Sequence, residues 1–416
     1  MNFFARYKKF FLIVGFLALV GLIGYLLWIL FFRAAVVIPP AETLPAGEIS
    51  GLPSAGPSEG GEEIGEPGEG LPEAGGIPGI GAPSADEPNI LAVGGLTKTT
   101  TLVSSPTLNP TLSSDGRIQY YNKDDGRFYK LDADGNPVLL SDKVFHNAEN
   151  IVWSPDSDRA IIEYPDGNKI LYNFTTKKQV TLPAHWQEFS FSPNSEQIVS
   201  ESIGLDPDNR WLMASKDDGS QAVAIEKIGT RDNIVYPSWS PNNQAVAIYT
   251  DGIDAERQEV FFVGLNNENF KSTIIEGRGL EFQWSDAGDR LLYSVYHSRD
   301  NYNPRLWIVN AQGDSIGQNR ISLDLATWAD KCTFASNTEI YCAVPENLEN
   351  GSGFFPELAD RTKDNLYKID LKTGAKKLIA VPDGAYNISQ IIVPENQDYL
   401  YFTDKQTEEI YQVRLR

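Results

Sequence analysis

Few side chains in this sequence have the type and spacing that catalysis or metal binding requires. The three histidines, His146, His185 and His297, stand in separate parts of the chain, and none has a second metal ligand at a suitable spacing. We therefore expect no catalytic residue, no metal site and no bound cofactor.

Two Asp-rich segments, residues 122–126 and 132–135, have a faint similarity to calcium-binding loops. Neither supplies the full series of oxygen ligands or the closing glutamate of an EF-hand. Both contain an Asp-Gly pair, and hairpin turns favour such pairs because these residues adopt positive φ at low cost. We interpret both segments as turns between strands.

Cys332 and Cys342 are the only cysteines, and the turn-forming residues 336–339 lie between them. This spacing places the two cysteines on adjacent strands of one hairpin, nearly opposite each other. In an exported protein such a pair should form a disulfide, which would contribute roughly 2–3 kcal/mol for so short a loop. Two reduced cysteines in the core are the alternative.

The residues best suited to partner binding are aromatic and arginine side chains on long loops, because such residues dominate protein-binding hot spots. The long loops are expected at residues 204–209, 251–258, 297–304 and 345–364. The candidate binding residues on or beside them are Arg257, Tyr296, Arg299, Tyr302, Phe354 and Phe355. Under the alternative interpretation, Phe354 and Phe355 only plug the longest loop against the domain.

A repeated pattern must position these loops. An apolar segment ends, a Ser-Pro-Asp-like turn follows, and a second apolar segment begins, with copies anchored at positions 112, 153, 191, 239, 284, 334 and 392. A repeat of about 40–50 residues with four short strands is typical of propeller blades. We predict an all-β β-propeller over residues 98–416 with seven four-stranded blades. Six or eight blades would follow if a weak copy is misassigned.

One repeat shows all four strands, at residues 149–153, 159–164, 169–174 and 179–182. The last repeat supplies strands only at 392, 399–403 and 409–415, so it lacks an outer strand. Residues 98–103 form a β-branched stretch with no other assignment. We predict that this stretch is the missing strand, which would close the ring and remove exposed sheet edges.

The clearest turn copies, at residues 153–156, 191–194, 239–242 and 284–287, resemble the WD-like repeats of the TolB propeller family, and so does the strand 159–162 that follows the first. The resemblance implies an exported bacterial protein-binding platform rather than an enzyme. Similar blades gate peptidases of the prolyl-oligopeptidase type, but this chain has no room for a hydrolase domain beside the propeller. A shared fold does not fix function.

Charge is distributed unevenly along the chain. The formal net charge is −21, and the part from Lys98 onward carries −15 of it. A domain this acidic is repelled by phosphate backbones, so DNA and RNA are excluded as partners.

Residues 10–32 form an uncharged apolar run long enough to cross a membrane, which takes about 20 residues as a helix. A cleaved signal peptide, with a shorter apolar region, is the alternative. Three basic residues (Arg6, Lys8 and Lys9) precede the run and only Arg33 follows it closely. The positive-inside rule therefore predicts a cytoplasmic N-terminus, residues 1–9, and export of everything after the anchor.

Residues 33–97 are rich in Pro, Gly and Glu and have no apolar periodicity, so we expect a disordered acidic tether. Taken together, these features predict a non-enzymatic, membrane-tethered module whose loop-rich face binds a protein or polymer at the cell envelope. One alternative is a ligand-binding or hydrolytic propeller that uses acidic residues at the central channel, with calcium as a candidate ion. A purely structural envelope component is the other.

Overall fold

The computed structural model describes residues 19, 21–22, 25, 87–266 and 268–416. The expected anchor and tether lie outside the described residues, apart from four helical positions within 10–32 and the stretch 87–97. Within these described ranges, no helix is long and apolar enough to span a membrane.

The Ser-Pro-Asp turns are held by hydrogen bonds within each turn. Ser154 is buried, and its hydroxyl donates to Asp156 (2.5 Å) and accepts from the backbone N–H five residues further on (3.1 Å). Ser157 adopts a φ of 61° between them, which reverses the chain. The serines of the next two repeats, Ser192 and Ser240, donate to an asparagine in the same way (2.7 Å each). Local sequence therefore determines where the inner hairpins of these three blades turn.

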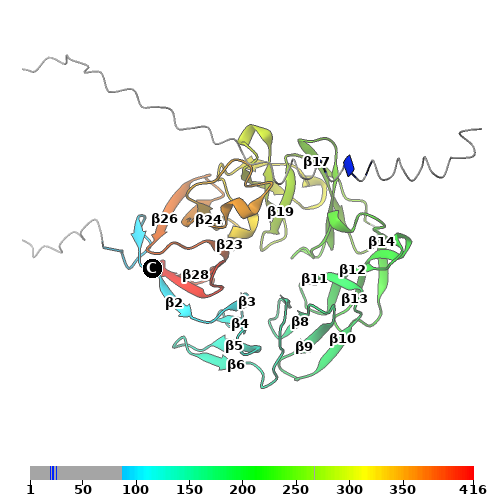
Figure 1. Ribbon diagram of the computed structural model, residues 1–416, viewed down its shortest axis with the longest axis horizontal. Helices are drawn as coiled ribbons and strands as arrows, with labels where there is room; N and C mark the ends of the chain where they lie inside the picture. The colour runs from blue at the N-terminus through cyan, green and yellow to red at the C-terminus, as the bar shows by residue number, and fades with distance from the viewer. Residues whose placement is uncertain (1–18, 20, 23–24, 26–86, 267) are drawn as a thin grey trace, which may run out of the picture. The chain divides into compact units, whose positions relative to one another are not determined.

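These hairpins build seven sheets arranged in a ring (Figure 1), so the predicted seven-bladed propeller is confirmed. Blades 1 to 4 each have four antiparallel strands in chain order from the centre outward. Blade 1 contains β3 (Thr107–Leu112), β4 (Ile118–Asn122), β5 (Arg127–Leu131) and β6 (Pro137–Leu139); blade 2 contains β7 (Asn150–Trp153), β8 (Arg159–Glu163), β9 (Lys169–Asn173) and β10 (Gln179–Leu182). Blade 3 contains β11 (Trp186–Phe191), β12 (Gln197–Ile203), β13 (Arg210–Lys216) and β14 (Val223–Lys227); blade 4 contains β15 (Val235–Pro237), β16 (Ala247–Gly252), β17 (Arg257–Val263) and β18 (Thr273–Glu276).

The remaining blades complete the ring. Blade 5 contains β19 (Arg278–Trp284), β20 (Arg290–Tyr296), β21 (Pro304–Asn310) and β22 (Ile321–Ser322). Blade 6 contains β23 (Cys332–Ser336), β24 (Glu339–Pro345), β25 (Asp364–Asp370) and β26 (Lys376–Pro382), and blade 7 contains β27 (Ile388–Ile392), β28 (Tyr399–Asp404) and β29 (Ile410–Arg414). Single-turn 3₁₀ helices interrupt the connections: η1 (Pro207–Asn209), η2 (Asp232–Ile234), η3 (Ser298–Asp300), η4 (Gly313–Ser315), η5 (Ala329–Lys331) and η6 (Pro356–Ala359).

The ring closes as the sequence predicts. β2 (Thr100–Val103) pairs antiparallel with β29 and forms the outer strand of blade 7. The structure adds a strand from the expected tether, because β1 (Leu96–Thr97) pairs parallel with β26 and becomes the fifth strand of blade 6. Two outer edges are thus covered by residues from the beginning of the domain.

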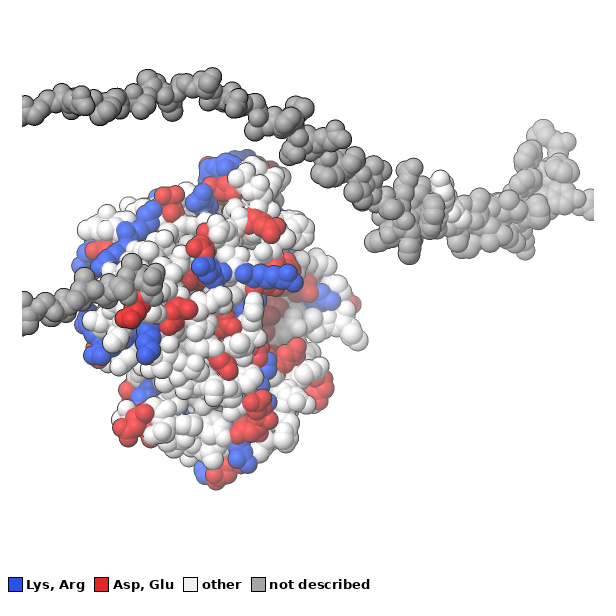
Figure 2. All heavy atoms as spheres, turned by 60° about the vertical axis from the view of Figure 1, so that its left-hand side comes forward, with Lys and Arg blue, Asp and Glu red and all other residues white. Residues whose placement is uncertain are grey.

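The core is divided among the junctions between blades. Each of the seven apolar clusters joins two neighbouring blades; the one between blades 2 and 3, for example, combines Ile161 and Leu171 with Trp186 and Ile198. The predicted disulfide is present: Cys332 and Cys342 are bonded and lie directly opposite each other in the β23–β24 pair. On the side of the domain drawn in Figure 2, acidic and basic side chains are interspersed, without a broad area of one sign.

Candidate functional site

The connections between second and third strands lie along one face of the ring, which we call the loop-rich face. The long ones are residues 204–209 in blade 3, 297–303 in blade 5 and 346–363 in blade 6, whereas the blade 4 connection, residues 253–256, is as short as that of blade 1. The blade 4 connection is shorter than expected, because β16 and β17 extend into it. As a consequence, Arg257 is the first residue of β17 and Tyr296 is the last residue of β20, so neither belongs to a loop.

The structure brings four of the six predicted residues together in one group, which we call the loop aromatic cluster: Tyr296, Tyr302, Phe354 and Phe355. The rings of Phe354 and Phe355 meet edge to face with centroids 4.6 Å apart, and Tyr296 contacts Phe354 in the same way at 5.5 Å. The ring centroids of Tyr302 and Tyr296 lie 6.5 Å apart. Phe354 and Phe355 are 55% and 56% exposed, so these two rings do not plug the loop against the blades.

Backbone hydrogen bonds join the loops of blades 5 and 6 beneath this cluster. The N–H of Gly351 donates to the carbonyl of Asn301 (2.8 Å), and the N–H of Gly353 donates to that of Tyr302 (2.8 Å). A Cβ at position 353 would lie 2.6 Å from the Cβ of Tyr296, so the close approach requires glycine there. The backbones of the two loops are therefore joined directly beneath the rings.

Tyr302 has an unusual backbone conformation. Its φ is 56°, the same value as that of the preceding Asn301, and a bulky residue in the left-handed region costs about 1–2 kcal/mol. Strain of this kind persists only where surrounding contacts enforce it, and it is concentrated at functional sites. Here the backbone of Tyr302 accepts a hydrogen bond from Gly353 (2.8 Å) and donates one to His297 (3.0 Å), and its side chain is 47% exposed.

The two predicted arginines lie in ion pairs rather than in the aromatic cluster. Arg257 pairs with Asp254 (2.7 Å), and Arg299 pairs with Glu276 (2.8 Å). Both guanidinium groups are about half exposed, so their contribution to stability is small. They neutralise neighbouring carboxylates along the loop-rich face, and their side chains stay accessible to solvent.

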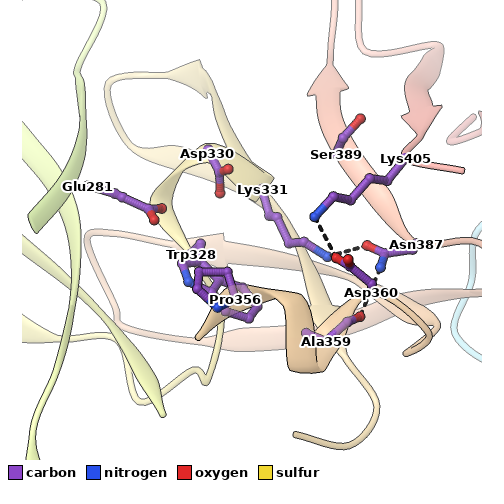
Figure 3. A pocket seen from close by; sticks show the side chains of 10 residues that line it. All are labelled: Glu281, Trp328, Asp330, Lys331, Pro356, Ala359, Asp360, Asn387, Ser389 and Lys405. Atoms are coloured by element: carbon purple, nitrogen blue, oxygen red, sulfur yellow. Dashed lines mark hydrogen bonds and ion pairs between the residues drawn. The ribbon is translucent and has the colours of Figure 1, made fainter. Parts of the chain in front are cut away.

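A cavity that the sequence did not predict lies beside this region, at the inner strands of blades 5 to 7. This channel cavity has a volume of about 110 Å³ (Figure 3). Its wall includes Pro356 and Ala359 of η6, so it is bounded by the same loop that carries Phe354 and Phe355. The other lining residues are Glu281, Trp328, Asp330, Lys331, Asp360, Asn387, Ser389 and Lys405.

Two lysines in the channel cavity have carboxylate partners, whereas two carboxyl groups have no cation. Lys331 donates to Asp364 at 2.8 Å, and Lys405 donates to Asp360 at 2.6 Å. Burial raises the pKa of Glu281 to about 8, and the nearby charge of Asp330 adds to this effect. Asp330 keeps contact with solvent, but the protein atoms around it remove part of its hydration. This desolvation raises the pKa of Asp330, and the charge of Lys331 partly offsets the rise.

A second buried glutamate lies in blade 3, away from this cavity. Glu201 on β12 is 0% exposed, and one of its carboxyl oxygens has no hydrogen-bond partner. Burial raises its pKa to about 7, partly offset by a hydrogen bond from Gln187. Glu201 is therefore a second example of a carboxyl group whose pKa is raised by burial without a neighbouring cation in the described domain.

The Asp-rich segments behave as turns. Asp132 accepts from the backbone N–H groups of Asp134 (2.9 Å) and Asn136 (2.8 Å), which closes the β5–β6 hairpin. In the part of the chain that the structure describes, no group of three or more His, Cys, Asp or Glu side chains is arranged to hold a metal ion.

Comparison with known proteins gives the fold but no family. No protein-family model matches the chain, and no curated protein matches it. Among solved structures, an oligogalacturonate lyase in complex with manganese is 14% identical over 76% of this chain and 93% of its own, with a TM-score of 0.50. A prolyl endopeptidase is 12% identical over 76% of this chain and 49% of its own, also with a TM-score of 0.50.

A third structure, the Cps50 (Swd1) propeller domain of Myceliophteria thermophila, is 12% identical over 76% of this chain and all of its own, with a TM-score of 0.48. The likeness to the oligogalacturonate lyase and the prolyl endopeptidase shows a common propeller fold and nothing about activity. The neighbours have mixed functions, and the TolB resemblance stays a prediction.

Proposed function

We propose that this protein is a non-enzymatic interaction module, tethered to the membrane by its N-terminal segment, that binds a protein partner at the cell envelope. The contact surface is the loop aromatic cluster. The observation that carries the proposal is the exposure of Phe354 and Phe355, each more than half accessible although both rings are fixed by neighbouring rings.

Two physical arguments support this proposal. Large rings that are already ordered lose little conformational entropy on binding, so more of the burial energy contributes to affinity. The joined backbones of the loops at 297–303 and 346–363 supply that order. The strain at Tyr302 is a cost to folding that a binding surface would explain.

The alternative of a ligand-binding or hydrolytic propeller gains one observation, the pair of carboxyl groups of Glu281 and Asp330 in the channel cavity. None of the three histidines lines this cavity. Because its wall belongs to the loop that carries the aromatic cluster, we assign the cavity to partner recognition.

Photo-crosslinking in cells tests the proposed function. A photoreactive phenylalanine analogue at position 302 should give a discrete adduct with one partner, and the same analogue at position 177 should give none. Lys177 lies in the turn before β10, outside the loop-rich face. The adduct from position 302 should disappear in the Phe354→Ala/Phe355→Ala variant.

Leu205→Ala provides a matched control, because Leu205 is a fully exposed apolar residue in the blade 3 connection of the same face. This variant should leave the adduct intact. An adduct that survives loss of both phenylalanines, or no adduct from position 302 at all, would overturn the proposed binding surface.

A further inference from the structure

The loop that carries Phe354 and Phe355 also forms part of the wall of the channel cavity. Phe355 is the N-cap residue of η6, and the next residue, Pro356, forms part of the cavity wall. Consecutive residues of one loop thus contribute an exposed ring and part of the cavity wall.

The charges inside the cavity favour a cation. Lys331 is balanced by Asp364 and is also held by Asn387 (3.0 Å), and Lys405 is balanced by Asp360. Figure 3 shows these two lysines on the side of Asn387 and Asp360, away from Glu281. The carboxyl groups of Glu281 and Asp330 face the other part of the cavity.

The carboxyl group of Glu281 lacks a hydrogen-bond donor within the described part of the chain. Its Oε2 atom is buried and has no hydrogen bond, and no bond or ion pair connects its carboxyl group to another described residue. An unsatisfied buried carboxyl oxygen costs about 1–3 kcal/mol, and that cost would be recovered by a donor that enters the cavity. The fold therefore leaves a place for a hydrogen-bond donor at this position.

An aromatic ring lines the same cavity. Trp328 is 6% exposed, and the Nζ atom of Lys331 lies 5.8 Å from the centroid of its ring. Trp328 and Pro356 lie below Asp330 in Figure 3 and give the cavity an apolar floor. An apolar floor beneath two carboxyl groups matches a side chain with an apolar stem and a cationic end.

We propose that the channel cavity receives a basic side chain, lysine or arginine, from the partner that binds the loop aromatic cluster. This inference rests on the proposed function and specifies the chemistry of the partner: apolar residues next to a basic one. The cavity volume of about 110 Å³ accommodates the end of one side chain, and a larger cavity of about 460 Å³ adjoins it at Asp330, Ser389 and Lys405.

Proton release should accompany this binding. The charged groups that line the cavity with Glu281 are Asp330, Lys331, Asp360 and Lys405, and Tyr236 on β15 interacts electrostatically with Glu281 from the neighbouring blade. Asp330 is the charged neighbour that raises the pKa of Glu281. A bound cation favours the ionised form of Glu281 and lowers that pKa. Affinity for the cation should thus rise as pH increases through about 8, the pKa of Glu281 in the unoccupied cavity.

Three probes test the inference on the full-length chain in detergent micelles by isothermal titration calorimetry. They are acetyl-Phe-Arg-Phe-amide, its neutral analogue acetyl-Phe-Gln-Phe-amide, and agmatine, which carries a guanidinium and a primary ammonium group without any aromatic ring. Arginine is chosen because its charge does not change over the pH range used. The Arg peptide should bind about tenfold more tightly at pH 9 than at pH 6.5, and the Gln peptide should show no such change.

Variants separate the cavity from the rings. Glu281→Gln should abolish the rise in affinity for the Arg peptide with pH, and Asp330→Asn should weaken its binding about tenfold. Glu357→Gln, which alters an exposed carboxylate of η6, is the matched control and should change neither result. Phe355→Ala should weaken the peptide but leave agmatine unaffected.

Several outcomes would overturn the inference. These are equal binding of the Arg and Gln peptides, no binding of either at millimolar concentration, or a pH dependence that survives in Glu281→Gln. Agmatine binding as tightly as the Arg peptide would show a site for small cations instead. If the crosslink at position 302 persists while the peptides fail, only this inference fails and the proposed function stands.

Discussion

Two clusters of aromatic rings in this propeller have similar ring geometry and opposite exposure. The inner aromatic cluster, between blades 1 and 2, consists of Phe128, Phe145, Trp153, Tyr172 and Phe174, with edge-to-face contacts at 4.9–5.4 Å. Phe128 is 0% exposed at its centre. The loop aromatic cluster has edge-to-face contacts at 4.6–5.5 Å, yet its two phenylalanines are more than half exposed.

The difference lies in what surrounds the rings. The inner cluster is enclosed because β-strands of two blades pack on both sides of it. The loop cluster rests on Tyr296 at the end of β20 and on two joined loops, and nothing in the described domain covers its outer side. Contact between rings therefore does not distinguish a buried core from an exposed surface cluster, whereas the exposed fraction of the rings does.

The largest effect should come from the enclosed region. Phe128→Ala removes the ring that contacts all but one of the other members of the inner cluster directly, and it should lower the free energy of unfolding by about 3–5 kcal/mol. Urea unfolding followed by tryptophan fluorescence would measure this loss. The crosslink from position 302 should persist at temperatures where the variant is folded. A loss below about 1 kcal/mol would contradict the contrast between the two clusters.

Removal of the disulfide should cause the second-largest loss of stability. It joins β23 to β24, and β24 leads directly into the loop at 346–363. The Cys332→Ala/Cys342→Ala variant should lose about 2–3 kcal/mol of unfolding free energy, because the cross-link restricts the unfolded chain. Reductant should destabilise the wild type by a similar amount and leave the variant unchanged. Equal stability of oxidised and reduced wild type would contradict this prediction.

Glu201→Gln tests the cost of a buried acid away from the loop-rich face. The pKa of Glu201 is about 7 in the folded state and about 4.3 when unfolded. Its contribution to stability is thus fully present below pH 4 and is lost as pH rises through 7. The variant should be more stable than wild type by about 2 kcal/mol at pH 8 and equal to it near pH 4.

Glu226→Gln, on the outer strand of the same blade, is the control for Glu201→Gln because its side chain is exposed. Thermal unfolding of both variants at pH 4 and pH 8 provides the comparison. A gain that is the same at both pH values would show that Glu201 acts through packing rather than through its ionisation.

The smallest effect on stability should accompany the largest effect on binding. Phe355→Ala removes an exposed ring, so the free energy of unfolding should change by less than about 1 kcal/mol. The yield of the adduct from position 302 should nevertheless fall about tenfold, as expected for a hot-spot residue. Destabilisation comparable to that of Phe128→Ala would mean that the loop cluster is part of the core.

The sequence by itself determined the features that depend on neighbouring residues. The serine hydroxyl bonds of the Ser-Pro-Asp turns span only a few residues, so the repeat could be located, and its seven copies gave the blade number. The spacing of Cys332 and Cys342 around one turn placed them opposite each other. The unassigned β-branched stretch at 98–103 matched the strand that the last blade lacked.

Only the tertiary structure decided what is exposed and what meets at the channel. Tyr296 and Phe354 are far apart in the chain, and the backbone bonds that bring their loops together have no sequence pattern. Glu281, Asp330 and Lys405 come from three blades, and their shared cavity arises from closure of the ring. Hydrogen bonds within a turn are local and leave a motif, whereas burial and charge pairing depend on side chains that the whole fold brings together.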